Sequence, residues 1–147
     1  MLKFSKKLEY ALISIFEIYD RNGHNPVTTK EIAMRYDIPL DLLGKVLQTL
    51  AKNRLVTSIQ GVKGGYTLNH PLKDIKVLQV VEAIEGPIAL IACQTEDVCK
   101  CDQHLNCNIR TPMEMIQSEL VQFFANISLE ELRNRNLKIQ SLIVNKV

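Results

Sequence analysis

The residues with the most distinctive chemistry in this chain are its four cysteines, which all lie within a span of fifteen residues. They are Cys93, Cys99, Cys101 and Cys107. In a cytosolic protein, clustered cysteines are more often metal ligands or redox groups than structural disulfides. The segment lacks the closely spaced cysteine knuckles that are usual in zinc sites, whereas iron–sulfur clusters accept wider loops. The spacing therefore favours an iron–sulfur cluster and leaves zinc or redox-active thiols as alternatives.

The elements that must position these thiols are predicted to be mostly helices, because apolar residues recur at the three- and four-residue spacing of a helical face. We predict helices over residues 5–20, 28–36, 40–53, 77–85 and 112–126, and a short helix from residue 128. Two short strands, 55–59 and 66–68, flank a glycine-rich loop and predict a β-hairpin. The cysteine segment, residues 91–108, shows no periodicity and is predicted to be a loop.

Capping boxes mark three of the predicted helix starts. They are Thr28 with Glu31, Thr111 with Glu114, and Ser128 with Glu131. In the first helix, the residues expected to face the core are Leu8, Leu12, Ile15 and Tyr19.

Residues 5–68 follow the order helix, helix, tight turn, helix, hairpin, which is the order of a winged helix-turn-helix. In such a fold the helix after the turn can enter the major groove, while the hairpin follows the DNA backbone. Cations for phosphate contacts are available at Lys45, Lys52, Arg54 and Lys63. Residues 1–70 contain ten Lys or Arg and six Asp or Glu, whereas residues 71–147 contain eight Lys or Arg and ten Asp or Glu. This mild basic excess in the front half agrees with DNA binding.

Composition excludes several other classes of protein. The chain is 46% apolar and 23% charged, as is usual for a globular domain, and no apolar run approaches the 18 residues of a membrane span. Lys3, Lys6, Lys7 and Glu9 interrupt the apolar core that a signal peptide needs, so we expect a cytoplasmic protein without a membrane partner. The sequence has no Ser/His/Asp grouping, phosphate loop or paired carboxylates in a plausible pocket context. We therefore expect no enzymatic activity and no small-molecule substrate.

Several short motifs, taken in order, resemble the IscR/NsrR/CymR family of bacterial winged-helix repressors over roughly residues 2–135. The motifs are Ser5-Lys6 followed by Tyr10-Ala11, Gly61-Val62-Lys63-Gly64-Gly65-Tyr66, Ile75-x-Val77, Glu85-Gly86-Pro87-Ile88, and Cys93-x7-Cys101-x5-Cys107-Asn108-Ile109-Arg110. The segment from Gly86 to Leu90 and the cysteine spacing look most similar to the branch that regulates SUF cluster-assembly genes.

The resemblance implies a homodimer whose long C-terminal helices, residues 112–126, cross. It also implies an iron–sulfur cluster, 2Fe–2S or 4Fe–4S, that is held by Cys93, Cys101 and Cys107. IscR-like members supply a histidine three residues after the last cysteine, but this chain has Arg110 there. Nitric-oxide-sensing members use an acidic residue of the first helix from the other subunit, which matches Glu9. Cys99 and His104 are local alternatives for this fourth ligand.

The residues expected to contact DNA come from the two helices of the helix-turn-helix and from the wing. They are Thr29, Lys30, Pro39, Leu40, Asp41, Lys45, Gln60, Lys63 and Gly64. Two positions depart from the family pattern: Gln60 stands where an arginine is common, and Gly44 where a polar side chain is common. Base recognition is therefore expected to differ from that of relatives.

The sequence as a whole predicts a mostly α protein, a winged helix-turn-helix with a long C-terminal dimerisation helix. Residues 1–70 would form the DNA-binding domain, and residues 71–147 the cysteine-rich cluster loop and the dimerisation helices. The predicted function is a repressor that senses iron–sulfur status and binds a palindromic operator. The resemblance implies that it controls cluster-assembly or iron-homeostasis genes. The alternatives are a nitric oxide or redox sensor of the same family, a small iron–sulfur carrier or electron-transfer protein, and a zinc-stabilised interaction module.

Overall fold

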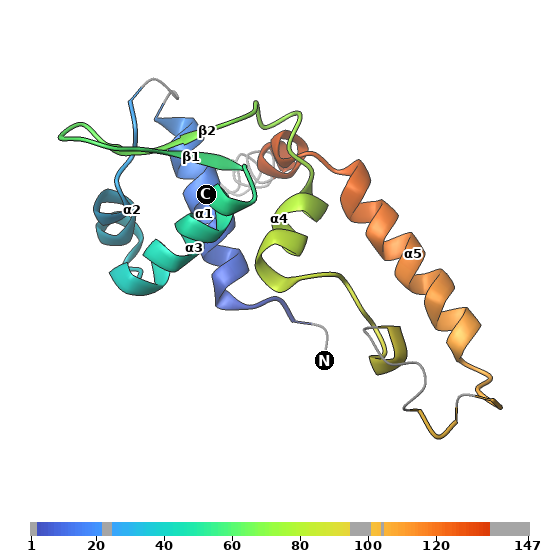
Figure 1. The fold of residues 1–147 in the computed structure, drawn as a ribbon. Coiled ribbons are helices and arrows are strands. Elements are labelled where there is room, and N and C mark those ends of the chain that lie inside the picture. The colour runs from blue at the N-terminus through green and yellow to red at the C-terminus, as the bar shows by residue number, and fades with distance from the viewer. Residues whose placement is uncertain (1–2, 22–24, 95–100, 104, 136–147) are drawn as a thin grey trace, which may run out of the picture.

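The computed structural model describes residues 3–21, 25–94, 101–103 and 105–135 (Figure 1). Its elements, in chain order, are α1 (Lys6–Asp20), α2 (Thr29–Tyr36), α3 (Leu40–Lys52), β1 (Val56–Ile59), β2 (Gly65–Leu68), α4 (Val77–Glu85), the short 3₁₀ helix η1 (Ala92–Gln94) and α5 (Arg110–Asn126). Residues 129–135 are helical as well. The predicted winged helix-turn-helix is confirmed. Cys99 and His104 lie outside the described residues.

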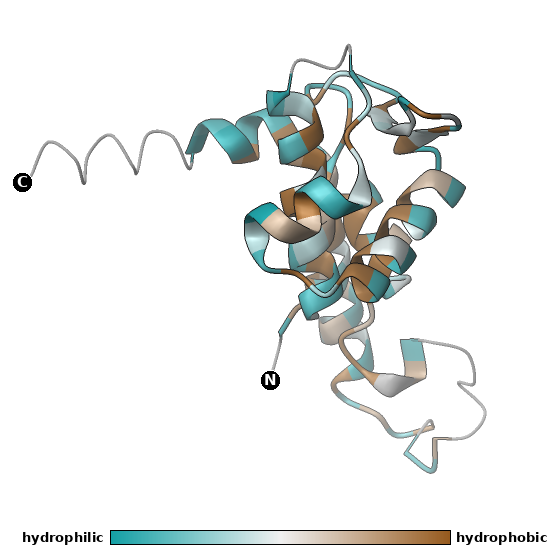
Figure 2. Ribbon diagram, turned by 90° about the vertical axis from the view of Figure 1, so that its left-hand side faces the viewer, coloured by the Kyte–Doolittle hydropathy of each residue, from teal (hydrophilic) through white to brown (hydrophobic). Residues whose placement is uncertain are grey.

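The core lies where α1, α3 and α4 pack against one another. Figure 2 colours the ribbon by residue hydropathy, and apolar segments alternate with polar ones along the helices, as expected for helices with one buried face. The core face of α1 consists of Leu8, Ala11, Ile15 and Ile18, each at most 2% exposed. Of the residues predicted to share this face, Leu12 is partly buried and packs against the core, whereas Tyr19 is 39% exposed. The prediction was therefore wrong only at Tyr19, near the end of the helix.

The core continues beyond residue 70. Leu72, Ile75 and Val80 are each at most 1% exposed and belong to the same apolar cluster as α1 and α3. Val77 donates its backbone N–H to the carbonyl of Ile127 at 3.0 Å, and Leu129 donates to the carbonyl of Ile75 at 2.8 Å. The start of α4 is thereby joined to the chain that follows α5. The division of function between residues 1–70 and 71–147 stays a prediction.

Two of the three expected capping boxes are present. The Glu31 N–H donates to the Thr28 hydroxyl at 3.2 Å, and the Thr28 N–H donates to the Glu31 carboxylate at 2.8 Å. Ser128 and Glu131 make the same pair of bonds, at 3.2 and 2.8 Å.

The third expected box, at Thr111 and Glu114, does not cap α5. The helix begins at Arg110, earlier than predicted, and its N-cap residue Ile109 has no side-chain hydrogen bond. The reason is local: the Glu114 carboxylate accepts a hydrogen bond from Arg110 Nε at 3.0 Å, so it is engaged inside the first turns of the helix.

The wing is the antiparallel pair β1–β2, in which Val56 pairs with Leu68 and Ile59 with Gly65. Its tip needs glycine for space. A Cβ on Gly64 would lie 2.5 Å from the Ile59 carbonyl oxygen, and one on Gly65, which has a φ of 149°, would lie 2.7 Å from the Val27 carbonyl oxygen. This close approach lets Tyr66 and Val27 exchange backbone hydrogen bonds of 3.0 and 2.8 Å. The wing is thereby fixed to the chain that enters α2.

A buried carboxylate joins α1 to the end of α2. Glu17 is 1% exposed and accepts hydrogen bonds from Arg21 Nε at 2.9 Å, Arg35 at 3.0 Å and the Tyr36 hydroxyl at 2.8 Å. Burial alone would raise the pKa of this carboxyl group, but the bonds from Tyr36 and Arg21 and the charge of Arg35 hold the pKa below its ordinary value of 4.5. The carboxylate therefore stays ionised, and its partners fix the orientation of α2 relative to α1.

We predict that Glu17→Gln lowers the free energy of unfolding at pH 7 by about 1–3 kcal/mol, because the arginines lose their anionic acceptor. The pKa of Glu17 is lower in the folded state, so its contribution is complete above about pH 4.5 and is lost as the pH falls through the folded-state pKa. Urea unfolding should therefore show a difference between wild type and variant that is constant near neutrality and shrinks below about pH 4.5.

The matched control for this prediction is Glu82→Gln, which changes an exposed glutamate of α4. It should leave the unfolding free energy within about 0.5 kcal/mol of the wild-type value. A Glu17→Gln variant as stable as this control would show that the buried carboxylate does not hold α1 and α2 together.

Candidate nucleic-acid interface and cysteine segment

The turn between α2 and α3 orients the helix predicted to read DNA. Asp37 has a left-handed backbone, with φ 52°, and ends α2. Ile38 is 6% exposed, and its N–H donates to the Ala33 carbonyl at 3.0 Å, so the turn is held in the core. Pro39 is exposed at the N-cap of α3. With this turn fixed, one face of α3 packs in the core and the other remains open to solvent.

The open face of α3 forms one wall of a hollow of about 690 Å³, and the start of α2 forms the other. Its lining residues are Thr28, Thr29, Lys30, Leu40, Asp41, Gly44, Lys45 and Gln48. Five of the residues predicted to contact DNA are therefore brought together on one surface. Gln48 and Thr28 were not predicted; Gln48 follows Gly44 by one helical turn, and this spacing alone would have placed it on the same face.

A second hollow of about 290 Å³ lies against the wing and shares Thr28 and Thr29 with the first. Gln60 and Gly64 line it. Lys63 is exposed at the tip of the wing and, like Pro39, lies outside both linings. The two hollows form a continuous surface from α3 to the wing, and we call this surface the α3–wing face.

The cysteine segment joins α4 to α5, and its described residues lie on the side of the molecule away from the wing (Figure 1). Cys93 lies in η1, and Cys107 comes shortly before α5. These two residues and Cys101 are free, half-buried thiols. The Cys101 thiol is 3.5 Å from the Gln103 side-chain oxygen. Over the described part of the chain, no three His, Cys, Asp or Glu side chains converge into a metal-binding group.

Arg110 is the third residue after Cys107 and begins α5. Its hydrogen bond to Glu114 and the negative charge of that carboxylate raise the pKa of the guanidinium, and Cys93 and Cys107 add to the effect. A guanidinium stays protonated and has no lone pair to give to a metal. Arg110 is therefore not a ligand, but it places a fixed positive charge beside Cys93 and Cys107.

Glu9, the predicted ligand from the other subunit, is exposed in the first turn of α1. Its carboxylate forms an ion pair of 2.5 Å with Lys6, and 46% of its side chain is accessible. Among the described residues it does not form a ligand group with the cysteines of its own chain.

The end of α4 that leads into the cysteine segment is tied to the start of α1. Glu85 accepts hydrogen bonds from the Ser5 N–H at 2.9 Å and from the Ser5 hydroxyl at 2.5 Å. Next to this contact, the rings of Phe4 and Phe124 lie 5.9 Å apart, so the N-terminal segment also touches α5. The end of α4 is thus held at the start of α1, and Leu90, directly before the cysteine segment, donates its N–H to the Gln117 side chain of α5 at 3.1 Å.

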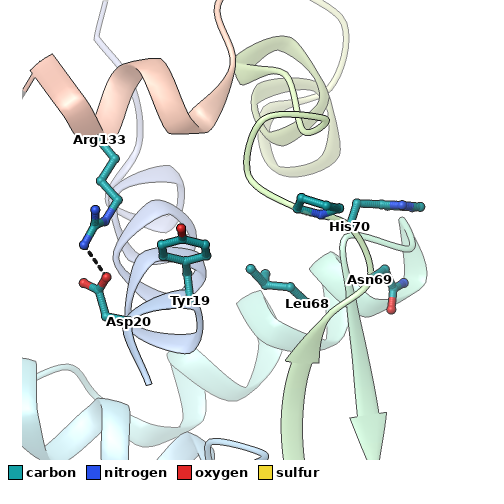
Figure 3. A pocket seen from close by; sticks show the side chains of 7 residues that line it. Tyr19, Asp20, Leu68, Asn69, His70 and Arg133 are labelled. Atoms are coloured by element: carbon teal, nitrogen blue, oxygen red, sulfur yellow. Dashed lines mark hydrogen bonds and ion pairs between the residues drawn. The ribbon is translucent and has the colours of Figure 1, made fainter. Parts of the chain in front are cut away.

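A pocket of about 720 Å³ lies between the end of α1, the residues after β2 and the helical residues 129–135 (Figure 3). Its charged groups are paired: Arg133 contacts the Asp20 carboxylate and lies 5.3 Å above the Tyr19 ring. The Asn69 amide donates to the Arg54 carbonyl at 2.8 Å. The side chains around this pocket therefore serve mainly to attach residues 129–135 to the winged helix-turn-helix.

No helix in the described ranges is both long and apolar enough to cross a lipid bilayer.

Comparison with known proteins identifies the family. Residues 4–135 match the family model Rrf2, described as an iron-dependent transcriptional regulator. The chain is 28% identical to the HTH-type transcriptional regulator IscR of Pectobacterium carotovorum over 133 residues, which cover 90% of this chain and 80% of that protein. It is 30% identical to a putative HTH-type transcriptional regulator of Haemophilus influenzae over 141 residues, which cover 95% of this chain and 93% of that protein.

Among solved structures, that of CymR, described as the global cysteine regulator of B. subtilis, superposes with a TM-score of 0.70. It is 25% identical, and the match covers 92% of this chain and 98% of CymR. These proteins are DNA-binding regulators and not enzymes, as the sequence predicted for this chain. The chain therefore belongs to the Rrf2 family of transcriptional regulators.

Proposed function

We propose that this protein is a dimeric repressor that reads a palindromic operator through its α3–wing face and senses iron–sulfur status through Cys93, Cys101 and Cys107. The observation that carries the proposal is the position of the three free thiols. They lie on the segment between α4, which packs against the DNA-binding helices α1 and α3, and α5, the helix proposed to form the dimer. A change in this segment therefore acts on both the core and the dimer contact.

The proposed docking places α3 in the major groove and the wing along the DNA backbone. Lys30 and Lys45 flank the hollow at α3, and Lys63 lies at the wing tip, so the cations are spread along the α3–wing face. Thr29, Pro39, Leu40, Asp41, Gln60 and Gly64 are the other proposed contact residues. Phosphate contacts by such lysines set the register of the protein on DNA, whereas the side chains of α3 distinguish bases.

The proposed dimer rests on the exposed apolar side chains of α5. None of its residues is fully buried within one chain. Met115 is 62% exposed, Ile116 51% and Phe123 53%. A long helix with large apolar side chains in water gains stability when a partner covers them. A second copy of the same helix is the proposed partner, because a two-fold dimer also gives two recognition helices for a palindrome.

The donor set suits an iron–sulfur cluster. Thiolates are the preferred ligands of such clusters, and three free, half-buried cysteines are present on one segment. When bound, the cluster would supply a centre that responds to iron, oxygen or nitric oxide. The cluster-assembly and iron-homeostasis genes are the proposed targets.

A nitric oxide or redox sensor is the second candidate function. The same three thiols favour it, together with the exposed Glu9, which is the proposed fourth ligand from the partner subunit. This candidate differs from the first in what the thiols respond to, and not in the mode of DNA binding.

DNA binding by the proposed docking should weaken steeply with added salt. Lys45→Ala and Lys63→Ala should each weaken binding on all DNA sequences, since phosphates are the same everywhere. The slope of the logarithm of the binding constant against the logarithm of the salt concentration changes by about 0.9 for each phosphate that is no longer neutralised. A dimer loses two such contacts, so each variant should make this slope shallower by about 1.8. Fluorescence anisotropy at several salt concentrations measures this. Lys73→Ala, which removes an exposed lysine outside both hollows, is the control. Unchanged slopes in both variants would contradict the docking mode.

The dimer should dissociate when the exposed side of α5 becomes charged. Ile116→Glu should convert a dimer at micromolar concentration into a monomer, because two carboxylates would be forced into the two-fold contact. Sedimentation velocity measures the change. Ser118→Glu places the same charge about half a turn around the helix and should leave the dimer largely intact. A wild-type protein that sediments as a monomer would rule out the proposed architecture.

The cluster ligands can be separated by anaerobic reconstitution of five single alanine variants. Cys93→Ala, Cys101→Ala and Cys107→Ala should lose the cluster, since each removes an anionic thiolate. Cys99→Ala should retain it, and Glu9→Ala should give a shifted absorption spectrum and a faster loss of iron. Iron per subunit is the measurement. If Cys99→Ala loses its iron while Cys101→Ala keeps it, then Cys99, and not Cys101, is the cluster ligand. A Glu9→Ala protein identical to wild type would exclude Glu9 as a ligand.

A further inference from the structure

Gly44 lies inside α3, on the helix face that lines the larger hollow. A Cβ built on Gly44 meets no atom within 4 Å among the described residues, and the backbone there is not in the left-handed region. Glycine inside a helix is less favourable than alanine, because its backbone loses more freedom on folding. Neither packing nor backbone conformation therefore requires glycine at this position, which points to a requirement outside the chain itself.

The surroundings of Gly44 form a notch with one apolar end and one polar end. Leu40, one turn before, is 50% exposed, and Gln48, one turn after, is exposed as well. Asp41 and Lys45 line the same hollow. The missing side chain leaves the surface of the helix backbone open between the leucine and the glutamine. A small apolar group that enters this notch would contact Leu40 and lie beside the amide of Gln48.

We propose that Gly44 determines base specificity by admitting the C5-methyl group of a thymine into this notch. The thymine methyl is the apolar group that a base pair presents in the major groove, and it is recognised by apolar side chains. Leu40 supplies the apolar contact. The Gln48 amide can form hydrogen bonds with N6 and N7 of adenine, so the notch and Gln48 together favour A·T pairs. The inference rests on the proposed docking of α3 in the major groove.

The chemistry of the notch favours a methyl group over the other parts of DNA. Lys30 and Lys45 line the same hollow and can hold a phosphate or a guanine there. The notch at Gly44 itself offers no hydrogen-bond donor, and the nearby carboxylate of Asp41 repels a phosphate that would enter it. A methyl group needs only space and an apolar neighbour, and both are present.

The test adds a methyl group to the protein and removes one from the DNA. Full-length wild type first selects its operator from randomised duplexes. Gly44→Ala should raise Tm by about 3 °C, because alanine suits the open helical site, yet weaken binding to this operator at least about fivefold by steric overlap. Replacing the contacted thymine by deoxyuridine should weaken wild-type binding about fourfold, the value of one buried methyl-sized group. The same replacement should strengthen binding by Gly44→Ala.

Ala51→Gly is the matched control, since it makes the reverse exchange on α3 outside the hollow. It should lower Tm without changing DNA affinity. The inference is overturned if Gly44→Ala binds as tightly as wild type, or if deoxyuridine at no position relieves its loss of affinity. Either result leaves the proposed function standing, because salt-dependent binding by wild type tests that function separately. A wild type that selects no DNA sequence overturns both.

Discussion

The buried carboxylate of Glu17 is the interaction on which the geometry of the DNA-binding surface depends. A charge removed from water must be paired, and Glu17 finds its partners in Arg21 on its own helix and in Arg35 and Tyr36 at the end of α2. α2 therefore cannot rotate about its contact with α1 without exposing an unpaired buried charge. The turn at Asp37 begins directly after Tyr36, so the direction of α3 follows from the same constraint.

The same logic extends to the second half of the chain, where α4 is attached at both ends. Its start is bonded to the backbone around Ile127, and its last residue, Glu85, to Ser5. The cysteine segment leaves α4 at this second attachment and returns to the chain at the start of α5. Leu90, which directly precedes the cysteine segment, also donates its N–H to the Gln117 side chain in the middle of α5 at 3.1 Å, so α4, the entrance of the segment and α5 are connected. In the proposed dimer, cluster binding to the segment would act through these contacts on the spacing of the two α3 helices.

Three positions in the proposed sites stand out by their chemistry. Gly44 carries no side chain within α3, Gln60 lines the hollow at the wing, and Arg110 places a guanidinium at the start of α5. The first two belong to the proposed base-reading surface. The third cannot serve as a metal ligand, because a guanidinium has no lone pair to give. Operator and ligand assignments should accordingly be made on this chain and not transferred from relatives.

The sequence by itself determined the order of the elements and most of their boundaries, because these depend on local chemistry. The capping boxes at Thr28 and Ser128 and the tight turn at Gly64 act within a few residues, so their spacing predicted them, whereas Gly65 is also required by the close approach of Val27 from a distant segment. The Glu17 network could not be predicted in this way, because its partners come from another helix, and a glutamate in an amphipathic helix is usually solvated. The exposure of α5 and the positions of the three thiols were likewise decided by tertiary packing. Contacts between distant segments depend on how helices dock, and periodicity within one helix contains no information about that.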